Sequence, residues 1–300
     1  MRTGDPVCTE RTPRVMAARK LLRRAGRDRA GRFLAEGAQA VGAALASAGA
    51  SDPGGTRPAV LHELFATESA AHRHPGLLAT ADEVGVPVSL LTDRAAQGLS
   101  ETVTPQGLIA VCGLLDVGLE DALAGSPRLV VVLVEAADPG NAGTVIRVAD
   151  AAGADAVLMA GDGVDVHNGK CVRGSAGSVF HLPLARVRDV PTALQSCRRA
   201  GLRLLAAAGD GDLDLDRAGA DGILDGPCAW LFGNEAHGLP DAVASAADHR
   251  VAVPIYGRAE SLNLATAAAV CVYATARAQR SSTIAPDRVR RTESAETTVR

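Results

Sequence analysis

Hydrophobic and polar positions divide the chain into two stretches in which strand-like and helix-like segments alternate. Short apolar runs predict strands, and apolar residues at every third or fourth position predict the helices between them. In the first stretch, strands are predicted at Val60–Phe65, Val86–Leu91 and Leu108–Cys112, and helices at Gly37–Ala48, His74–Val84 and Asp93–Gly98. This alternation indicates a small α/β domain over residues 13–115.

The second stretch has the clearer pattern. Leu129–Glu135 is almost entirely apolar and rich in β-branched residues, as expected of a strand buried on both faces. Further strands are predicted at 156–159, 179–184, 202–208, 229–232 and 251–253, with helices at 141–152, 191–201 and 261–280 and an acidic loop at 210–226. Strands that alternate with helices pair in parallel. We therefore expect residues 128–280 to form a mostly parallel sheet with helices on both faces.

Three further segments lack such a pattern. Residues 1–12 are polar and are predicted to be flexible. Residues 116–127 contain two glycines and a proline and are predicted to be a linker. Residues 281–300 are polar without an apolar period and are predicted to be a disordered tail.

Composition narrows the class of protein. With 47% hydrophobic and 22% charged residues, the chain is expected to fold around a packed core. A net charge of -3 argues against a protein that is basic throughout and coats nucleic acid. The six cysteines form no C-x-x-C pair and no zinc spacing, so we expect reduced thiols and no metal. The longest apolar runs are too short to cross a bilayer and no secretory signal is visible, so we expect a cytoplasmic protein without membrane contact.

A strongly basic segment lies near the N-terminus. Nine lysines and arginines fall between Arg11 and Arg32, and Asp28 is the single acidic residue among them. Apolar residues recur at helical spacing within it, which predicts a helix with an apolar stripe and a basic remainder. That remainder is either a solvated face or an arm that contacts phosphates. The candidates for phosphate contact are Arg19, Lys20, Arg23 and Arg24.

Several familiar motifs are incomplete. Gly163–Cys171 resembles a phosphate-binding loop, but its spacing is wrong and a cysteine stands where a hydroxyl should hold magnesium. Asp210–Asp216 begins like a calcium loop, but it lacks the glycine of the turn. No G-x-G-x-x-G opens a helix after a predicted strand, which excludes an ordinary dinucleotide-dependent oxidoreductase.

Three motifs in the second stretch are complete. They are Asp138–Arg147, Leu231–Leu239 and Val253–Leu264, and each lies where a strand meets a loop. Open α/β sheets bind ligands at the carboxyl ends of their strands. Any one motif alone is explained by turn and capping chemistry, because Gly, Asn and Ser are common at helix starts. All three motifs in this order are not explained by turn chemistry alone and indicate a particular kind of site.

With these motifs the chain resembles the SpoU-type branch of the SPOUT superfamily, the RNA ribose 2′-O-methyltransferases, over residues 13–280. The residues that carry the resemblance are Asn141 and Arg147 in the first motif, Gly233, Glu235 and Gly238 in the second, and Pro254, Gly257, Ser261, Leu262 and Asn263 in the third. Arg32–Gly37 matches the Phe-Leu-x-Glu-Gly segment of the family's substrate-binding domain, which is built like a small ribosomal protein. Two departures are Ile255, where many members have Met, and Ala265, where many have Ser.

The resemblance implies a fold, a cofactor and a set of site residues. The fold is α/β, with a trefoil knot in the C-terminal, mostly parallel sheet and a small α/β substrate-binding domain before it. The methyl donor is S-adenosylmethionine, and no metal is required. The donor is expected to bind at Ala208, Gly233, Val253, Ile255, Leu262 and Leu264. The catalytic residues implied are Arg147, Asn141, Glu235, Ser261 and Asn263.

Arg147 is the family's proposed proton acceptor. Because a guanidinium stays protonated at neutral pH, we expect it instead to organise the substrate phosphate and stabilise the developing alkoxide, while a phosphate oxygen or water takes the proton.

The resemblance also implies partners. The substrate is structured RNA, either ribosomal or transfer RNA, and ribosomal RNA is favoured because a separate N-terminal domain is typical of ribosomal RNA modifiers. Arg173 is a second RNA-facing candidate beside the basic segment. The last helix is expected to form a homodimer interface, or else to pack only within its own domain; its small apolar stripe is Leu262, Ala265, Ala269, Val272 and Ala276. Two alternatives stay open: a non-catalytic RNA-binding or ribosome-assembly protein with a knotted domain, and a methyltransferase that protects ribosomes from antibiotics.

Overall fold

The computed structural model describes residues 6–49 and 61–284. The predictions for residues 1–5, for Val60 and for the tail beyond Ile284 lie outside this described part. The chain divides into two compact units. The first unit comprises residues 1–117, 137–147 and 164–184, and the second comprises 118–136, 148–163 and 185–300.

The first unit contains a four-stranded sheet with the order β1-β4-β2-β3. Its strands are β1 (Arg32–Glu36), β2 (Leu61–Thr67), β3 (Val88–Leu91) and β4 (Leu108–Gly113). β4 pairs antiparallel with β1 and β2, and β2 pairs parallel with β3. The helices of this sheet are α3 (Ala38–Gly49), α4 (Glu68–Arg73), α5 (Pro75–Glu83) and α6 (Asp93–Leu99). The predicted small α/β organisation is confirmed, although β1 was not predicted as a strand.

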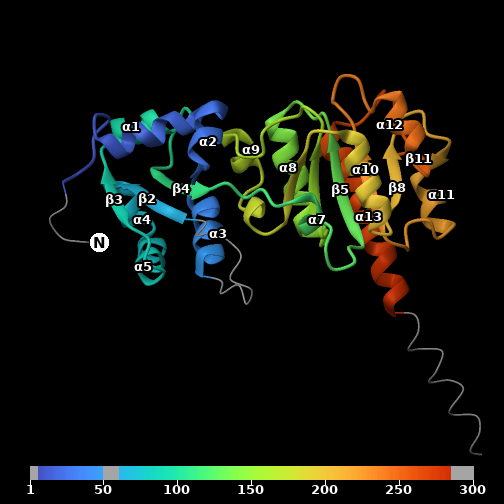
Figure 1. Ribbon diagram of the computed structural model, residues 1–300, viewed down its shortest axis with the longest axis horizontal. Helices are drawn as coiled ribbons and strands as arrows, with labels where there is room; N and C mark the ends of the chain where they lie inside the picture. Colours follow the sequence, from blue (N-terminus) through green and yellow to red (C-terminus); the bar gives the residue numbers. More distant parts are fainter. Residues whose placement is uncertain (1–5, 50–60, 285–300) are drawn as a thin grey trace, which may run out of the picture. The chain divides into compact units, whose positions relative to one another are not determined.

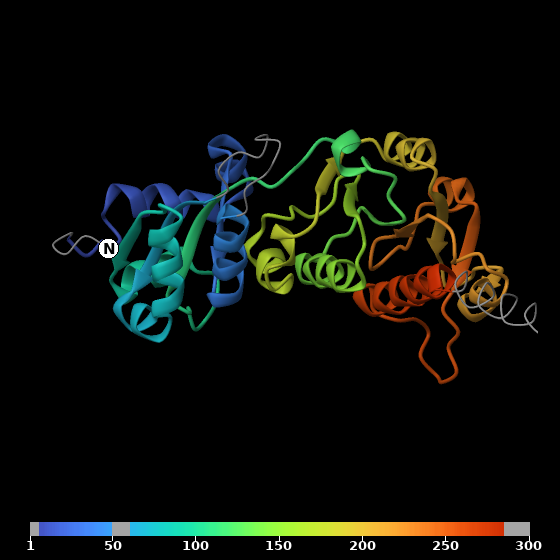
Figure 2. The same ribbon diagram turned by 90° about the horizontal axis from the view of Figure 1, so that it is seen from below.

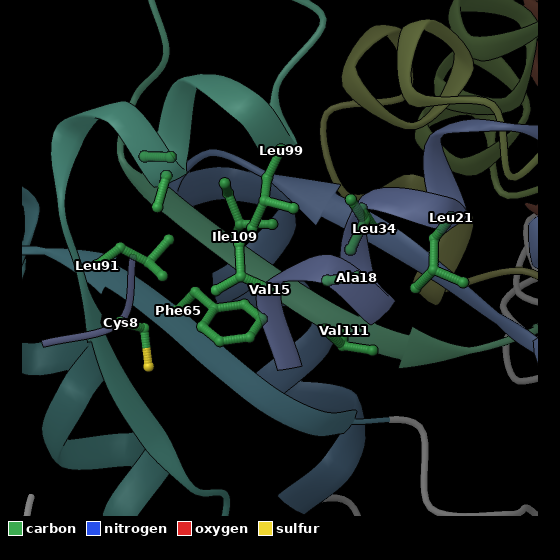
Figure 3. Packing of buried hydrophobic residues seen from close by; sticks show 12 residues of the cluster. Cys8, Val15, Ala18, Leu21, Leu34, Phe65, Leu91, Leu99, Ile109 and Val111 are labelled. Carbon is green, nitrogen blue, oxygen red and sulfur yellow. The ribbon is translucent and has the colours of Figure 1, made fainter. Parts of the chain in front are cut away.

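The basic segment is not one helix. It forms α1 (Pro13–Arg19), the 3-10 turn η1 (Lys20–Leu22) and α2 (Arg24–Ala30), because Arg23 adopts an extended backbone with φ -102° and ψ 140°. Val15, Ala18 and Leu21 point into a core that also contains Phe65 and Ile109 (Figure 3). Figure 1 shows α1 and α5 on opposite faces of the first sheet.

The segment before α1 is ordered from Cys8 onward. The Cys8 N–H donates to the Leu90 carbonyl at 2.7 Å, and the Thr92 N–H donates to the Cys8 carbonyl at 3.0 Å. The Cys8 side chain is buried in the same core. The prediction of flexibility through residue 12 is therefore wrong from Cys8 on, because this short segment pairs with the edge strand β3.

The second sheet is seven-stranded with the order β7-β6-β5-β10-β8-β11-β9. Its strands are β5 (Leu129–Val134), β6 (Ala156–Ala160), β7 (Leu184–Val187), β8 (Arg203–Ala207), β9 (Leu213–Asp214), β10 (Cys228–Phe232) and β11 (His249–Ala252). The ladders of β5 with β6 and β10, of β8 with β10 and β11, and of β11 with β9 are all parallel. The predicted mostly parallel sheet is confirmed.

Helices cover both faces of the second sheet. α13 (Leu264–Ile284) packs on β5 and β10, α10 (Val190–Arg199) packs on β6 and β8, and Figure 2 shows these two helices on opposite faces. Trp230 on β10 donates from Nε1 to Thr275 Oγ1 on α13 at 2.8 Å, and both side chains are buried. The remaining helices are α7 (Leu119–Ala122), α8 (Pro139–Ala152), α9 (Gly169–Gly174), α11 (Leu215–Ala220), α12 (Asp241–Ala246) and the 3-10 turn η2 (Ser178–Phe180).

Several predicted boundaries are wrong for local reasons. The apolar run at 179–184 begins as η2 rather than a strand, because Gly177 enters it with a φ of +101°. The predicted linker contains α7, and the predicted acidic loop contains β9 and α11. In that loop Asp214 caps α11 by accepting from the Arg217 N–H. α13 continues through Ile284, so the start of the predicted tail is helical.

Candidate active site

The first motif lies in the turn from β5 into α8. Asp138 precedes the helix and accepts the Asn141 N–H at Oδ1 (2.8 Å), while its Oδ2 lies 2.6 Å from Lys170 Nζ. The hydrogen bond from Lys170 and the backbone N–H of Asn141 lower the pKa of Asp138 below its usual value. An ionised side chain at this position caps the helix and complements its dipole. The turn therefore fixes where α8 begins and where Asn141 lies.

Asn141 and Arg147 both lie on α8, as predicted. Their six-residue separation corresponds to about 9 Å of rise along the helix axis. Arg147 is exposed, and within the described part of the chain it pairs with no carboxylate. A guanidinium without a protein partner is available for a phosphate, which it binds through a planar fork of N–H donors.

α9 packs directly on the first turns of α8. A Cβ on Gly143 would lie 2.3 Å from the Cys171 carbonyl oxygen, so only glycine allows this approach. Arg173 lies on α9. It is half-buried, and its Nη1 is 3.5 Å from Oε2 of the buried Glu36. This ion pair engages the guanidinium, so the structure favours a structural role for Arg173 over the predicted contact with RNA.

The second motif forms a closed turn after β10. Asn234 and Gly238 exchange backbone hydrogen bonds of 2.9 and 2.8 Å. A Cβ on Gly233 would lie 2.1 Å from the Gly238 carbonyl carbon, and Gly238 has a φ of +71°. Both glycines are therefore required by the turn. Glu235 is exposed within this turn.

Asn234 joins this turn to the end of β5. Its Nδ2 donates to the Glu135 carbonyl at 2.9 Å, and its Oδ1 accepts the Ala236 N–H at 2.9 Å. Glu135 has a φ of +52°, a left-handed conformation that is uncommon for a non-glycine residue. No role was predicted for Asn234 or Glu135 from the sequence. The place of Asn234 between the glycine and the glutamate of the second motif is the feature of the sequence that could have indicated its role.

The third motif precedes α13. Asn263 caps this helix: its Oδ1 accepts the Ala265 N–H at 2.9 Å, and its carbonyl accepts the Ala267 N–H at 2.9 Å. The helix consequently begins at Leu264 rather than at the predicted Ser261. Ser261 is exposed in the segment before it. Helix capping is therefore one reason for an asparagine at position 263 of the motif.

Three of the six predicted cofactor residues lie at one sheet edge. β10, β8 and β11 are adjacent and parallel, so their carboxyl ends share an edge. Gly233, Ala208 and Val253 follow directly after these three strands. The Ala208 N–H donates to the Val251 carbonyl at 3.0 Å. This bond continues the pairing of β8 with β11, so the loop that follows Ala208 begins at the end of the sheet.

The apolar side chains among the predicted cofactor residues are only partly buried. Val253, Leu262 and Leu264 are half-buried, and Ile255 is 38% exposed. An adenine ring requires apolar walls and a few backbone partners, and the loops after parallel strands supply both. Among the described residues, no group of three or more His, Cys, Asp or Glu side chains is placed to hold a metal ion. No described helix has both the length and the apolarity to cross a membrane.

Arg27 is one of the nine basic residues of the N-terminal segment, but the first unit buries its side chain. Its Nε and Nη2 are each 2.9 Å from Asp165 Oδ2, and its Nη1 donates to the carbonyls of Leu21 (2.9 Å) and Leu22 (3.0 Å). Burial by itself raises the pKa of Asp165, but the His167 ring, the His167 backbone N–H and the Arg27 guanidinium together hold it well below its usual value. The pair is a structural element and is not available to RNA.

Comparison with known proteins agrees with this geometry. Residues 128–273 match the SpoU rRNA methylase family, and residues 12–110 match the MRM3-like substrate-binding domain. The 23S rRNA (guanosine(2553)-2′-O)-methyltransferase RlmP of Bacillus subtilis (strain 168) is 33% identical over 255 residues, which cover 85% of this chain and 92% of RlmP.

Two solved structures are similar over most of their length. The AdoMet-bound rRNA methyltransferase from Sinorhizobium meliloti superposes with a TM-score of 0.75 at 28% identity, covering 90% of this chain and 98% of that one. The SpoU methyltransferase AviRb from Streptomyces viridochromogenes, in complex with AdoMet, has a TM-score of 0.75 at 29% identity, covering 90% of this chain and all of AviRb. The three motifs, the parallel sheet that carries them and these similarities together establish that the chain belongs to the SpoU rRNA methylase family.

Proposed function

We propose that this protein transfers a methyl group from S-adenosylmethionine to a ribose 2′-hydroxyl of ribosomal RNA. The observation that carries the proposal is Arg147 on α8, which is exposed and forms no ion pair with a described carboxylate. The loops of the other two motifs follow the carboxyl ends of two strands of the parallel sheet. Relatives named as 23S rRNA 2′-O-methyltransferases and similar structures that contain AdoMet support the same reaction and the same donor.

The protein's part in this reaction is to position groups and to stabilise charge. S-adenosylmethionine, when bound, supplies a methyl group on a positively charged sulfur. Arg147 remains protonated, binds the phosphate next to the target ribose and stabilises the oxyanion that develops on the 2′-oxygen. A phosphate oxygen or a water molecule accepts the hydroxyl proton. Positioning of this kind is worth about 7–11 kcal/mol when the reacting atoms are aligned.

The remaining motif residues hold the loops and the ribose. Asn141 lies in the first turn of α8, and Glu235 lies in the closed turn after β10. Ser261 and Asn263 precede α13. In this proposal they orient Arg147 and the ribose, and the donor is held by Ala208, Gly233, Val253, Ile255, Leu262 and Leu264. The family's trefoil knot brings these loops together, and it stays a prediction for this chain.

A domain organisation and a location follow from the same proposal. Residues 13–115 bind RNA, with Arg19, Lys20, Arg23 and Arg24 as phosphate contacts, and all four side chains are exposed. Residues 128–280 carry the methyl transfer. Modification of ribosomal RNA places the protein in the cytoplasm. The intact Arg147 favours an enzyme over a non-catalytic assembly protein.

The proposed homodimer uses a different face of α13 from the one that the sequence predicts. Ala265, Val272 and Ala276 are buried within the second unit, so this part of the predicted stripe packs on its own sheet. Among the described side chains of α13, Val270 (40% exposed) and Tyr273 (44% exposed) are the large apolar ones on its exposed side. A second copy of this chain is the proposed partner of that side.

Two measurements on the full chain test the proposal. Titration calorimetry should show binding of S-adenosylmethionine, and mapping of ribose methylation across total RNA should show one ribosomal site that is modified only when the protein is present. Donor binding without any change in ribose methylation would assign the protein to the non-catalytic class. Absence of donor binding would overturn the proposal.

A further inference from the structure

The basic segment of the first unit encloses a groove. Residues of α1, η1 and α2 line it, and its volume is about 950 Å³. This volume falls in the range of pockets that accept a ligand of small-molecule size, such as a nucleotide. The groove belongs to the N-terminal segment and contains none of the predicted catalytic or donor-binding residues.

The floor of the groove is apolar. Met16, Ala17, Leu22 and Ala25 line it, and the Met16 side chain is 53% exposed. Met16 is a large apolar side chain that is more than half exposed, Leu22 is half-buried, and the two alanines extend the apolar surface that a ligand can contact. The opposite side of the same helices, with Val15 and Ala18, is buried in the core of the first unit (Figure 3).

The rim of the groove is cationic. The basic side chains that line it are Arg11, Arg19, Lys20, Arg23 and Arg29. Among the described residues, none of these five pairs with a carboxylate. Glu10 is the acidic residue of the lining, and Arg94 already engages it at 3.5 Å. The groove therefore presents uncompensated positive charge around an apolar surface.

The shape of the groove is fixed by two buried contacts. A Cβ on Gly26 would lie 1.9 Å from the Lys20 carbonyl oxygen, so glycine is needed for α2 to fold back onto η1. Arg27 donates to the carbonyls of Leu21 and Leu22, which holds η1 in its turn. Because both contacts are internal to the protein, the groove does not depend on a ligand to form.

We infer that this groove binds an unpaired nucleotide of the RNA substrate, with the base on the apolar floor and the flanking phosphates on the cationic rim. The inference rests on the proposed function, since it assumes an RNA substrate. A regular duplex offers phosphates and hydroxyl groups at its surface but no exposed base face, so it would leave the floor uncovered. An unpaired base in a loop or bulge exposes an apolar face, and arginine side chains stack on such faces.

The test compares two RNA hairpins of equal length and charge, one fully paired in its stem and one with a single unpaired nucleotide in that stem. Binding to the full chain is measured by fluorescence anisotropy at several salt concentrations. We expect about tenfold tighter binding of the hairpin with the unpaired nucleotide, the magnitude of one stacked base.

Two variants separate the floor from the rim. Met16→Gln keeps the charge and length of the side chain, and it should abolish the preference while leaving affinity for the paired hairpin unchanged. Arg23→Gln should weaken binding of both hairpins and lower the salt slope by about one. The matched controls are Val103→Thr, at a residue that is 98% exposed outside the groove, and Arg188→Gln, at an exposed ion pair of the second unit. Both controls should bind like the unchanged protein.

Equal affinity of the unchanged protein for both hairpins overturns the inference, and so does a preference that survives in Met16→Gln. Calorimetry with S-adenosylmethionine on the same samples keeps the two proposals apart. Donor binding without a preference between hairpins removes only the groove inference. A preference without donor binding supports the groove and removes the proposed methyl transfer.

Discussion

Arg27 and Asp165, which are 138 positions apart in the chain, form a buried ion pair in which two guanidinium nitrogens lie 2.9 Å from one carboxylate oxygen. Both side chains are at most 6% exposed. The third guanidinium nitrogen holds the η1 carbonyls, so one arginine joins the N-terminal helices to the segment that leads into α9. His167 follows Asp165 closely; its Nε2 accepts the Leu115 N–H at 3.0 Å, which places its ring proton on Nδ1, toward Asp165.

Arg27→Met should destabilise the first unit by about 3–5 kcal/mol, because it leaves a buried carboxylate without its partner. The measurement is chemical denaturation followed by far-UV circular dichroism. Trp230, the single tryptophan, lies in the second unit, so its fluorescence follows that unit separately. Arg24→Met is the matched control, because Arg24 is exposed and lies 4.0 Å from Asp28, and it should cost less than about 1 kcal/mol. Equal losses in both variants would contradict the assignment of Arg27.

The stability of the first unit should fall in acid through Asp165. The native pKa of this carboxyl is lowered, so its contribution is complete above the unfolded value of about 3.9 and is lost as the pH falls through the native value. Asp165→Asn should remove this part of the pH dependence, leaving a flatter curve below about pH 4, where the unfolded carboxyl takes up its proton. Denaturation of both proteins across that range measures it. If the unfolding free energy of Asp165→Asn falls with pH as steeply as that of the unchanged protein, other carboxyl groups cause the loss of stability in acid.

Arg147→Ala should lower the rate of methyl transfer by about 100- to 1000-fold, as expected for loss of a charge stabiliser, while the affinity for S-adenosylmethionine stays the same. Single-turnover methylation gives the rate and calorimetry gives the affinity. Arg188→Ala, at an exposed arginine of the second unit, is the control and should retain both. A loss of donor affinity as large as the loss of rate would move Arg147 from the RNA side of the reaction to the donor side.

Gly233→Ala should disrupt the turn after β10, because its Cβ would lie 2.1 Å from the Gly238 carbonyl carbon. Overpacking of this kind costs about 1–3 kcal/mol, and we expect at least a tenfold loss of donor affinity as the loop moves. Gly226→Ala adds the same methyl group where no atom lies within 4 Å, and it should bind the donor normally. If Gly233→Ala also binds normally, the turn does not shape the donor site.

Tyr273→Glu should shift a homodimer toward monomers, because it places a charge on the exposed apolar side of α13. Sedimentation velocity over a range of protein concentrations measures the change. Val103→Glu introduces the same charge at an exposed site of the first unit and should have no effect. A dimer that persists in Tyr273→Glu must use another surface.

The sequence by itself determined the features that depend on local pattern. The apolar run Leu129–Glu135 predicted a buried strand, and the alternation after it predicted a parallel sheet with its motif loops at one edge. Asn141 and Arg147 were correctly assigned to one helix. These predictions succeed because strand and helix periods, capping residues and turn glycines act over a few neighbouring positions.

Tertiary structure decided the features that depend on partners far apart in the chain. Arg27 has the same local pattern as its exposed neighbours, and only Asp165 makes its burial favourable. Arg173 forms an ion pair with Glu36, and the backbone of Cys8 pairs with β3. The apolar stripe of α13 is buried because it packs on β5 and β10. In each case the deciding contact is made by a residue that no local period can identify, because burial of a charged or apolar side chain is set by what packs against it.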